Sequence, residues 1–248
     1  MSDSASASPA FFGAAIELPD ADSGLRMYEL VESLYPICRS ITGDGVRETL
    51  AQISRRIPLT ISEVPSGTDA FDWTIPDEWN IRGGYIETLS GERVVDFADH
   101  NLHVLNYSEP VDQVVSNAEL HEHLFSMPDR PEWIPYRTSY YNRNWGFCVS
   151  HDQAQTLTDE RYRVVIDSTL EPGSLTYGEY FLQGETDEEI LISCHVCHPS
   201  LCNDNLSGIA MATALAEYLG GINRRFSYRF LFIPGTVGSI VWLSRNED

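Results

Sequence analysis

The sequence is poor in basic residues: 16 lysines and arginines stand against 37 aspartates and glutamates, for a formal net charge of −21. Such an excess of negative charge repels phosphate backbones and anionic lipid headgroups. We therefore expect neither nucleic acid nor an acidic membrane as a main partner. The charge favours cationic ligands, and it is also typical of an adaptation for solubility or high salt.

The sequence also lacks a long apolar run, and no stretch is suited to crossing a bilayer. Residues 1–24 have neither the basic start nor the apolar core of a secretory signal, and we expect them to form a loose tail. The cysteines are few and odd in number, five, with three of them close together beside histidines, which argues against a disulfide scaffold. These features together predict a reduced, cytoplasmic protein.

The remaining chain is long enough for one large domain or for a domain with an insertion. Apolar positions over 27–35 predict one helix, and residues 46–55, which Asp44 can cap, predict a second. Residues 71–154 are dense in Trp, Tyr, Pro and Gly, with short aromatic and β-branched runs between turn residues. This pattern predicts a β-rich inserted domain.

The last hundred residues alternate between strand and helix patterns. Residues 209–219 are rich in Ala and Leu and predict a helix that Gly220 and Gly221 end. The short apolar run EILIS (189–193) is typical of a buried strand in a parallel sheet. Further strands are expected at 59–64, 162–167, 177–183 and 227–233. We therefore expect an α/β fold from residues 25–70 and 155–248, with a mostly parallel sheet flanked by helices.

The loop that follows EILIS reads CHVCHPSLCNDNLSG and concentrates histidine, cysteine and aspartate. In open α/β sheets, ligands bind beyond the carboxyl ends of the strands, where such a loop lies. An imidazole from His195 and a carboxylate from Asp204 suit a borderline cation such as zinc. Taken singly, Asp204 could be only a helix cap and His195 only a hydrogen-bonded histidine. Their combination in one loop favours a metal or catalytic site.

Four separated motifs resemble one family, the aminopeptidase-like proteins labelled as polysaccharide biosynthesis proteins with an aminopeptidase-like domain. They are YPICRSITGDGVRETL, VPSGTDAFDWTIPDEWNIRGGYI, NLHVLNYSEPV and EILISCHVCHPSLCNDNLSGIAMATALAEYL. That family is similar to the zinc aminopeptidases and glutamate carboxypeptidases. The resemblance implies that His195 binds zinc and that Asp204, in DNLSG (204–208), binds or bridges the metal.

Two departures from the peptidase pattern leave the catalytic residues unassigned. Cys197 replaces the Asp of His-x-Asp and is followed by His198, a weaker candidate for a metal ligand. The place of the peptidases' Glu pair reads PGTVGSI (234–240), without a carboxylate. The resemblance also implies that the family's remaining ligands lie beyond Asp248. We expect a partial site of a zinc-dependent hydrolase that acts on a small peptide or amide.

Three alternatives stay open at this point. The segment CHVCH (194–198) matches the pattern for c-type haem attachment, although such attachment normally accompanies export. A small zinc knuckle could use Cys194, Cys197, Cys202 and His198 as ligands, although their spacing is irregular. The chain could also be a non-catalytic aminopeptidase-like module that binds sugars or peptides through the aromatic-rich insertion. His121 and His123 stay unassigned, because their side chains would diverge on a helix.

Overall fold

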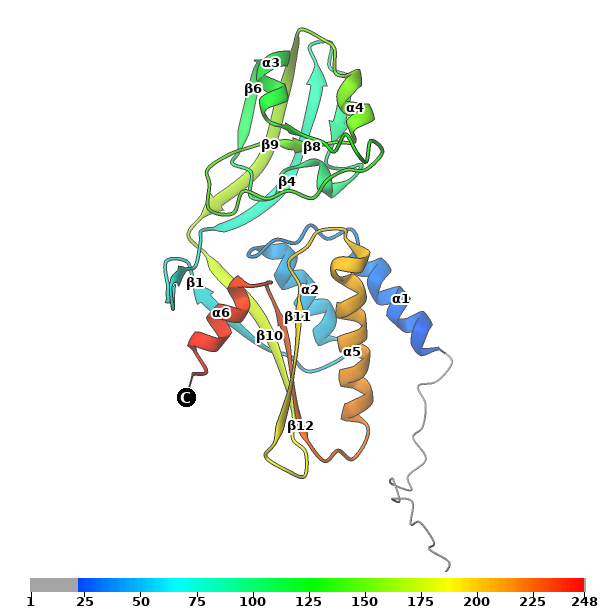
Figure 1. Cartoon of the computed structure of the whole chain (residues 1–248), viewed down its shortest axis with the longest axis vertical. Coiled ribbons are helices and arrows are strands. Elements are labelled where there is room, and N and C mark those ends of the chain that lie inside the picture. Colours follow the sequence, from blue (N-terminus) through cyan, green and yellow to red (C-terminus); the bar gives the residue numbers. More distant parts are fainter. Residues whose placement is uncertain (1–21, 248) are drawn as a thin grey trace, which may run out of the picture.

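The computed structural model of the protein describes residues 22–247, which form an α/β part and a β-rich part stacked along the longest axis (Figure 1). Most of the tail expected over 1–24 lies outside the described residues. Its end does not match the expectation, because the first helix, α1 (Ser23–Leu34), begins inside it. No helix within 22–247 is long and apolar enough to span a membrane.

The α/β part is built on a four-stranded sheet whose two faces are both covered. Its order is β1 (Thr60–Pro65), β10 (Ser174–Leu182), β12 (Ser227–Ile233) and β11 (Glu189–His195). Helices α1, α2 (Asp44–Ser54) and α5 (Ser207–Gly220) pack on one face through a common apolar core. Helix α6 (Val237–Ser244) packs on the other face, against residues of β1, β10 and β12. This layering buries the apolar side chains of both faces.

The expectation of a mostly parallel sheet is wrong for these strands. Only β11 and β12 are parallel, whereas β1–β10 and β10–β12 are antiparallel. The short connection 183–188 reverses the chain between β10 and β11, and β12 then lies between them. The β11–α5–β12 unit is present as the sequence predicts. β11 is nevertheless an edge strand rather than a buried one, and Ile190 and Leu191 are exposed.

The β-rich part has its own antiparallel sheet, in the order β5 (Arg93–Asp96), β4 (Glu78–Thr88), β9 (Arg161–Glu171), β6 (Val111–Ser116). The prediction of a strand at 162–167 is confirmed, but its prediction as part of the α/β sheet is wrong. This strand forms part of β9, whose side chains Tyr162, Val164 and Ile166 complete the core of the β-rich part. The β-rich region consequently runs past residue 154 to Glu171.

Seven short elements complete the β-rich part and the segment that joins β1 to it. They are β2 (Asp69–Ala70), β3 (Trp73–Thr74), η1 (Asn101–His103), α3 (Asn117–Glu122), β7 (Leu124–Phe125), β8 (Phe147–Cys148) and α4 (His151–Thr156). Ser116 caps α3 and Ser150 caps α4, each by accepting a hydrogen bond from a backbone N–H of the first turn.

The two parts meet at the connection between α1 and α2. Ile41 from this connection packs with Trp79, Tyr107 and Cys197, which come from β4, the segment after η1 and the loop after β11. The Trp79 and Tyr107 rings stack with their centroids 5.8 Å apart. Gly43 adopts a φ of +93° against the Trp79 backbone, where no Cβ would fit. The contact brings the loop after β11 against the β-rich part.

Candidate metal centre

Three side chains that the sequence singles out meet at the end of β11. His195 Nε2 lies 2.6 Å from Asp204 Oδ1, and His198 Nε2 lies 3.9 Å from Asp204 Oδ2. One donor atom from each residue lies within 4.8 Å of the other two. The rings of His195 and His198 are 5.0 Å apart and tilted edge to face. Two imidazoles and a carboxylate therefore share one small space.

The backbone explains how Asp204 reaches His195. His195 is the last residue of β11, and Asp204 lies in an irregular helical turn, η2 (Cys202–Leu206), just before α5. Asp204 and Asn205 have non-helical backbone angles, with φ and ψ of −127° and 81° and of −153° and 52°. The residue at the N-cap of α5 is Leu206, with no side-chain cap. Asp204 is thus not the helix cap that the sequence left open as an alternative.

Hydrogen bonds join the loop that carries these donors to the end of α1 and to the segment that follows it. Arg39 Nε donates a 2.9 Å hydrogen bond to the His198 carbonyl oxygen, and Ser200 Oγ donates one of 2.7 Å to the Tyr35 carbonyl oxygen. Arg39 is fully buried. Sequence reasoning missed this residue, although it lies within the motif YPICRSITGDG that carries part of the family resemblance.

Cys197, which stands where the resemblance places the peptidase aspartate, contacts His198. Its Sγ lies 3.7 Å from His198 Nδ1 and accepts a 3.2 Å hydrogen bond from the Gly235 N–H. Cys197 therefore orients His198 rather than His195. This contact uses His198 Nδ1 and leaves Nε2 on the side of Asp204.

The cysteines do not assemble the knuckle or a haem attachment site. Cys194 and Cys197 are buried, whereas Cys202 is exposed, and no cysteine joins the donor cluster found among residues 22–247. Burial raises the pKa of Cys194 to about 12 and that of Cys197 to about 11, so both stay thiols at neutral pH.

The electrostatics suit cation binding. Burial lowers the pKa of His198, while the negative charge of Asp204 opposes this shift. The hydrogen bond from His195 holds the pKa of Asp204 below its usual value. Near neutral pH the cluster therefore offers a neutral His198 imidazole and a charged Asp204 carboxylate, the forms in which these groups bind metals.

The donor set fits zinc in its chemistry, and a small change in spacing would bring its atoms to ligand distances. Zinc takes nitrogen and oxygen ligands at about 2.0–2.2 Å, which places two tetrahedral donors about 3.4 Å apart. The 3.9 Å separation of His198 Nε2 from Asp204 Oδ2 is close to this value, whereas the 2.6 Å hydrogen bond between His195 Nε2 and Asp204 Oδ1 would have to open by about 0.8 Å for both atoms to bind one ion. The side chains of His195 and Asp204 are 38% and 59% exposed, so solvent and small molecules reach the site.

Neighbouring side chains shape the site without adding an acid or base. Where β12 ends beside His195, Gly235 lies against His195 and Cys197 and carries no side chain. From the β-rich part, the Tyr136 ring contacts the His198 ring edge to face, with centroids 5.3 Å apart. His121 and His123 are not in the cluster; the His123 ring stacks on Trp145.

Comparison with known proteins places the chain in a family. The model of a family described as a domain of unknown function, DUF4910, matches residues 28–248. A Clostridium acetobutylicum protein is 54% identical over 228 residues, which are 92% of this chain and 52% of that protein. It is provisionally named a polysaccharide biosynthesis protein with an aminopeptidase-like domain. A crystal structure of a provisionally assigned peptidase from this organism has 53% identity and a TM-score of 0.90, covering 92% of this chain and 55% of that one. The chain thus spans about half the length of these relatives.

More distant structures share the fold. A peptidase M28 precursor from Shewanella amazonensis SB2B has a TM-score of 0.57 at 12% identity, covering 91% of this chain and 69% of that one. A zinc aminopeptidase from Bacillus subtilis has a TM-score of 0.51 at 12% identity, covering 87% and 63%. The chain therefore shares its fold with these two structures. By family match and by its four motifs, the chain belongs to the DUF4910 family of aminopeptidase-like proteins.

Proposed function

We propose that the chain carries the metal-holding part of a zinc-dependent, aminopeptidase-like hydrolase of peptide or amide bonds. The observation that carries the proposal is the convergence of His195, His198 and Asp204 on one space. The aminopeptidase-like fold supports it, because ligands of open α/β sheets bind where these three residues lie.

Each residue around the metal centre has a proposed role. Bound zinc would polarise a substrate carbonyl and lower the pKa of a coordinated water to about 7. His195, His198 and Asp204 would hold the ion, and Cys197 and Arg39 fix His198 through its ring and its carbonyl oxygen. The exposed side of His195 and Asp204 would admit a small peptide or amide. Tyr136 would form one wall of the substrate space.

A second candidate is a non-catalytic aminopeptidase-like binding module, linked to polysaccharide biosynthesis as the name of the Clostridium relative suggests. One observation favours it. The segment PGTVGSI (234–240), which follows β12 and includes Gly235 beside His195, has no carboxylate, and hydrolysis requires a base to take the proton from water.

Hydrolysis of leucine p-nitroanilide by the zinc-supplemented chain separates the two candidates. The hydrolase proposal predicts a slow release of nitroaniline that the chelator EDTA abolishes, zinc restores, and His195→Ala removes. The matched control is His121→Ala, which changes a histidine outside the cluster. If the chain binds zinc but releases nitroaniline no faster than His195→Ala does, it is not a hydrolase by itself and the binding module is retained.

A further inference from the structure

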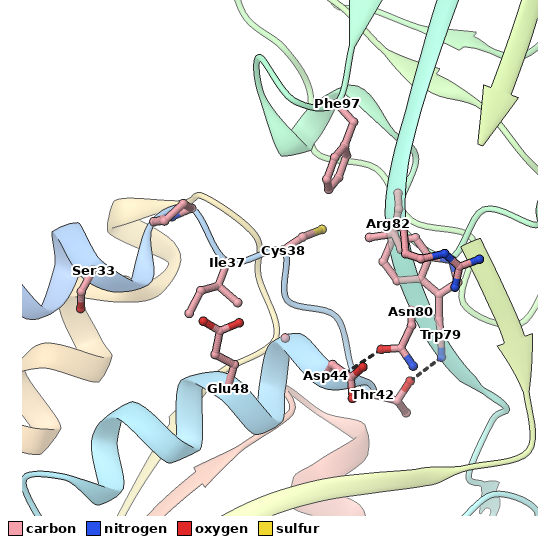
Figure 2. Close-up of a pocket in the computed structure, with 13 residues that line it drawn as sticks. Ser33, Ile37, Cys38, Thr42, Asp44, Glu48, Trp79, Asn80, Arg82 and Phe97 are labelled. Carbon is pink, nitrogen blue, oxygen red and sulfur yellow. Dashed lines mark hydrogen bonds between the residues drawn. The ribbon is translucent and has the colours of Figure 1, made fainter. Parts of the chain in front are cut away.

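A cleft of about 520 Å³ lies between the α1–α2 connection and strand β4 (Figure 2). One wall comes from residues 33–48 and the other from residues 79–82 and Phe97. Its volume falls within the range of small-molecule sites, about 300–1,000 Å³, and such sites often lie between packed domains. None of His195, His198 and Asp204 lines it, so it is separate from the metal centre.

The cleft has apolar walls that face one another. Figure 2 shows the Phe97 ring reaching from the β-rich part toward the side where Ile37 and Cys38 lie. Burial raises the pKa of the Cys38 thiol to about 12, so it contributes an uncharged surface. A flat or alkyl group of a ligand would lose contact with water between these walls.

The polar groups that line the cleft are engaged with the protein, with one exception. Thr42 Oγ1 contacts Tyr107 Oη at 2.6 Å, and Asn80 accepts a hydrogen bond from the Asp44 N–H and donates one to Glu78. Ser33 Oγ donates to the Leu30 carbonyl oxygen. Of the charged groups, Asp44 pairs with Arg47 and Arg82 pairs with Asp167 on β9.

The exception is Glu48, an exposed residue of α2 whose carboxylate rises toward the open space in Figure 2. Within residues 22–247, the Glu48 carboxylate makes no hydrogen bond and no ion pair within 4 Å. The buried Arg39 guanidinium interacts with this carboxylate electrostatically, without a hydrogen bond. Glu48 therefore presents to the cleft a carboxylate that has no direct partner and whose charge is opposed only at a distance by Arg39, on a protein whose net charge of −21 repels anions.

We propose that this cleft binds a small organic ammonium ion. Glu48 is the counter-ion of the ammonium group, and the ring or alkyl body of the ligand lies between Phe97 and Ile37. The proposal does not depend on zinc or on hydrolysis, because the cleft shares no residue with the donor cluster.

Benzylamine, which joins a ring to one ammonium group, is a suitable probe, and benzyl alcohol is its neutral counterpart. In ¹H–¹⁵N spectra of the full chain, benzylamine is expected to shift the amides of residues 33–48, 79–82 and 97 saturably, whereas benzyl alcohol binds more weakly. Glu48→Gln should weaken benzylamine binding about two- to fivefold, the order expected from losing one exposed ion pair. Because Glu48 is exposed, this variant should fold, and the dispersion of its spectrum checks that it does.

Two controls decide the outcome. Glu32→Gln removes an exposed carboxylate from α1 outside the cleft and should leave benzylamine binding unchanged. Phe97→Ala should weaken benzylamine and benzyl alcohol alike, because it removes the apolar wall rather than the charge. The proposal is overturned if benzyl alcohol binds as tightly as benzylamine, if Glu48→Gln has no more effect than Glu32→Gln, or if no saturation is seen up to about 20 mM.

Discussion

The fully buried guanidinium of Arg39 holds the backbone of His198, because Arg39 Nε donates a 2.9 Å hydrogen bond to the His198 carbonyl oxygen. Its Nη1 donates a 2.7 Å hydrogen bond to the Leu34 carbonyl oxygen at the end of α1. Burial lowers the pKa of Arg39 to about 10, which still leaves it charged at neutral pH. One cation thus joins a helix end to the loop that carries a proposed zinc ligand, 159 residues away in the sequence.

Arg39→Lys should weaken zinc binding by about tenfold, because residues that orient a ligand typically contribute that much to metal affinity. A single ammonium group cannot reproduce the geometry of the two guanidinium hydrogen bonds. The free energy of unfolding should also fall, by about 1–3 kcal/mol, for the unpaired carbonyl oxygen. Competition with a chromophoric chelator measures the affinity, and urea unfolding measures the stability.

The control for that experiment is Arg56→Lys. Arg56 pairs with Glu217 and joins α2 to α5 without contacting the loop after β11. The Arg56→Lys variant should have a lower free energy of unfolding than the wild type but the same zinc affinity. Equal zinc affinity for the wild type and Arg39→Lys would show that Arg39 stabilises the fold without orienting His198.

Replacing cysteines should leave the zinc content unchanged. Cys202 is exposed and Cys194 is a buried thiol that accepts a hydrogen bond from Asn205 Nδ2 over 3.5 Å. Neither belongs to the donor cluster, so Cys202→Ser and Cys194→Ser should bind as much zinc as the wild type in elemental analysis. Loss of zinc from both variants would instead favour the cysteine knuckle. Cys202→Ser is the cleaner variant, because an exposed position does not disturb the core.

The stability of the protein should fall in acid through Glu78. Its carboxylate accepts hydrogen bonds of 2.7 and 2.6 Å from Arg47 and one of 2.9 Å from the Ser174 N–H. The Arg47 guanidinium is the main cause that lowers the pKa of Glu78 from 4.5 to about 2. The folded state therefore binds fewer protons, and the stabilisation is present above pH 4.5 and is lost as the pH falls toward 2.

Urea unfolding at several pH values tests this assignment, with Glu78→Gln as the comparison. Glu78→Gln should be less stable than the wild type near neutral pH, and the difference should shrink below pH 4.5, where Glu78 of the unfolded chain becomes protonated. A difference that stays constant down to the lowest pH at which the protein folds would contradict a charged Glu78–Arg47 contact.

The sequence predicts individual helices and strands better than it predicts which strands pair with one another. The β11–α5–β12 unit follows from the apolar run at 189–193, the Ala-rich helix and the apolar run at 227–233. An apolar run does not say whether its strand lies in the centre or at the edge of a sheet, and β11 lies at the edge. Nor does it name the partner strand, which is why residues 162–167 were expected in the wrong sheet.

In the candidate site, too, the sequence predicts the residues but not the contacts that hold them in place. His195, His198 and Asp204 can be found from their residue types and the DNLSG motif, since all three lie within one loop of known chemistry. The contribution of Arg39 depends on how α1 packs against that loop, and the contact of Cys197 with His198 depends on the turn between them. Neither contact has a periodicity or a spacing that a sequence could display.

The most direct test of the central claim is the zinc affinity of the wild type compared with His195→Ala and Asp204→Asn. If one imidazole and one carboxylate bind the same cation, either substitution should weaken zinc binding at least about 100-fold, while His121→Ala should have no effect. Competition titrations with a chromophoric chelator at neutral pH give all four affinities. Zinc affinities for His195→Ala and Asp204→Asn equal to that of the wild type would contradict the assignment of this cluster as the metal centre.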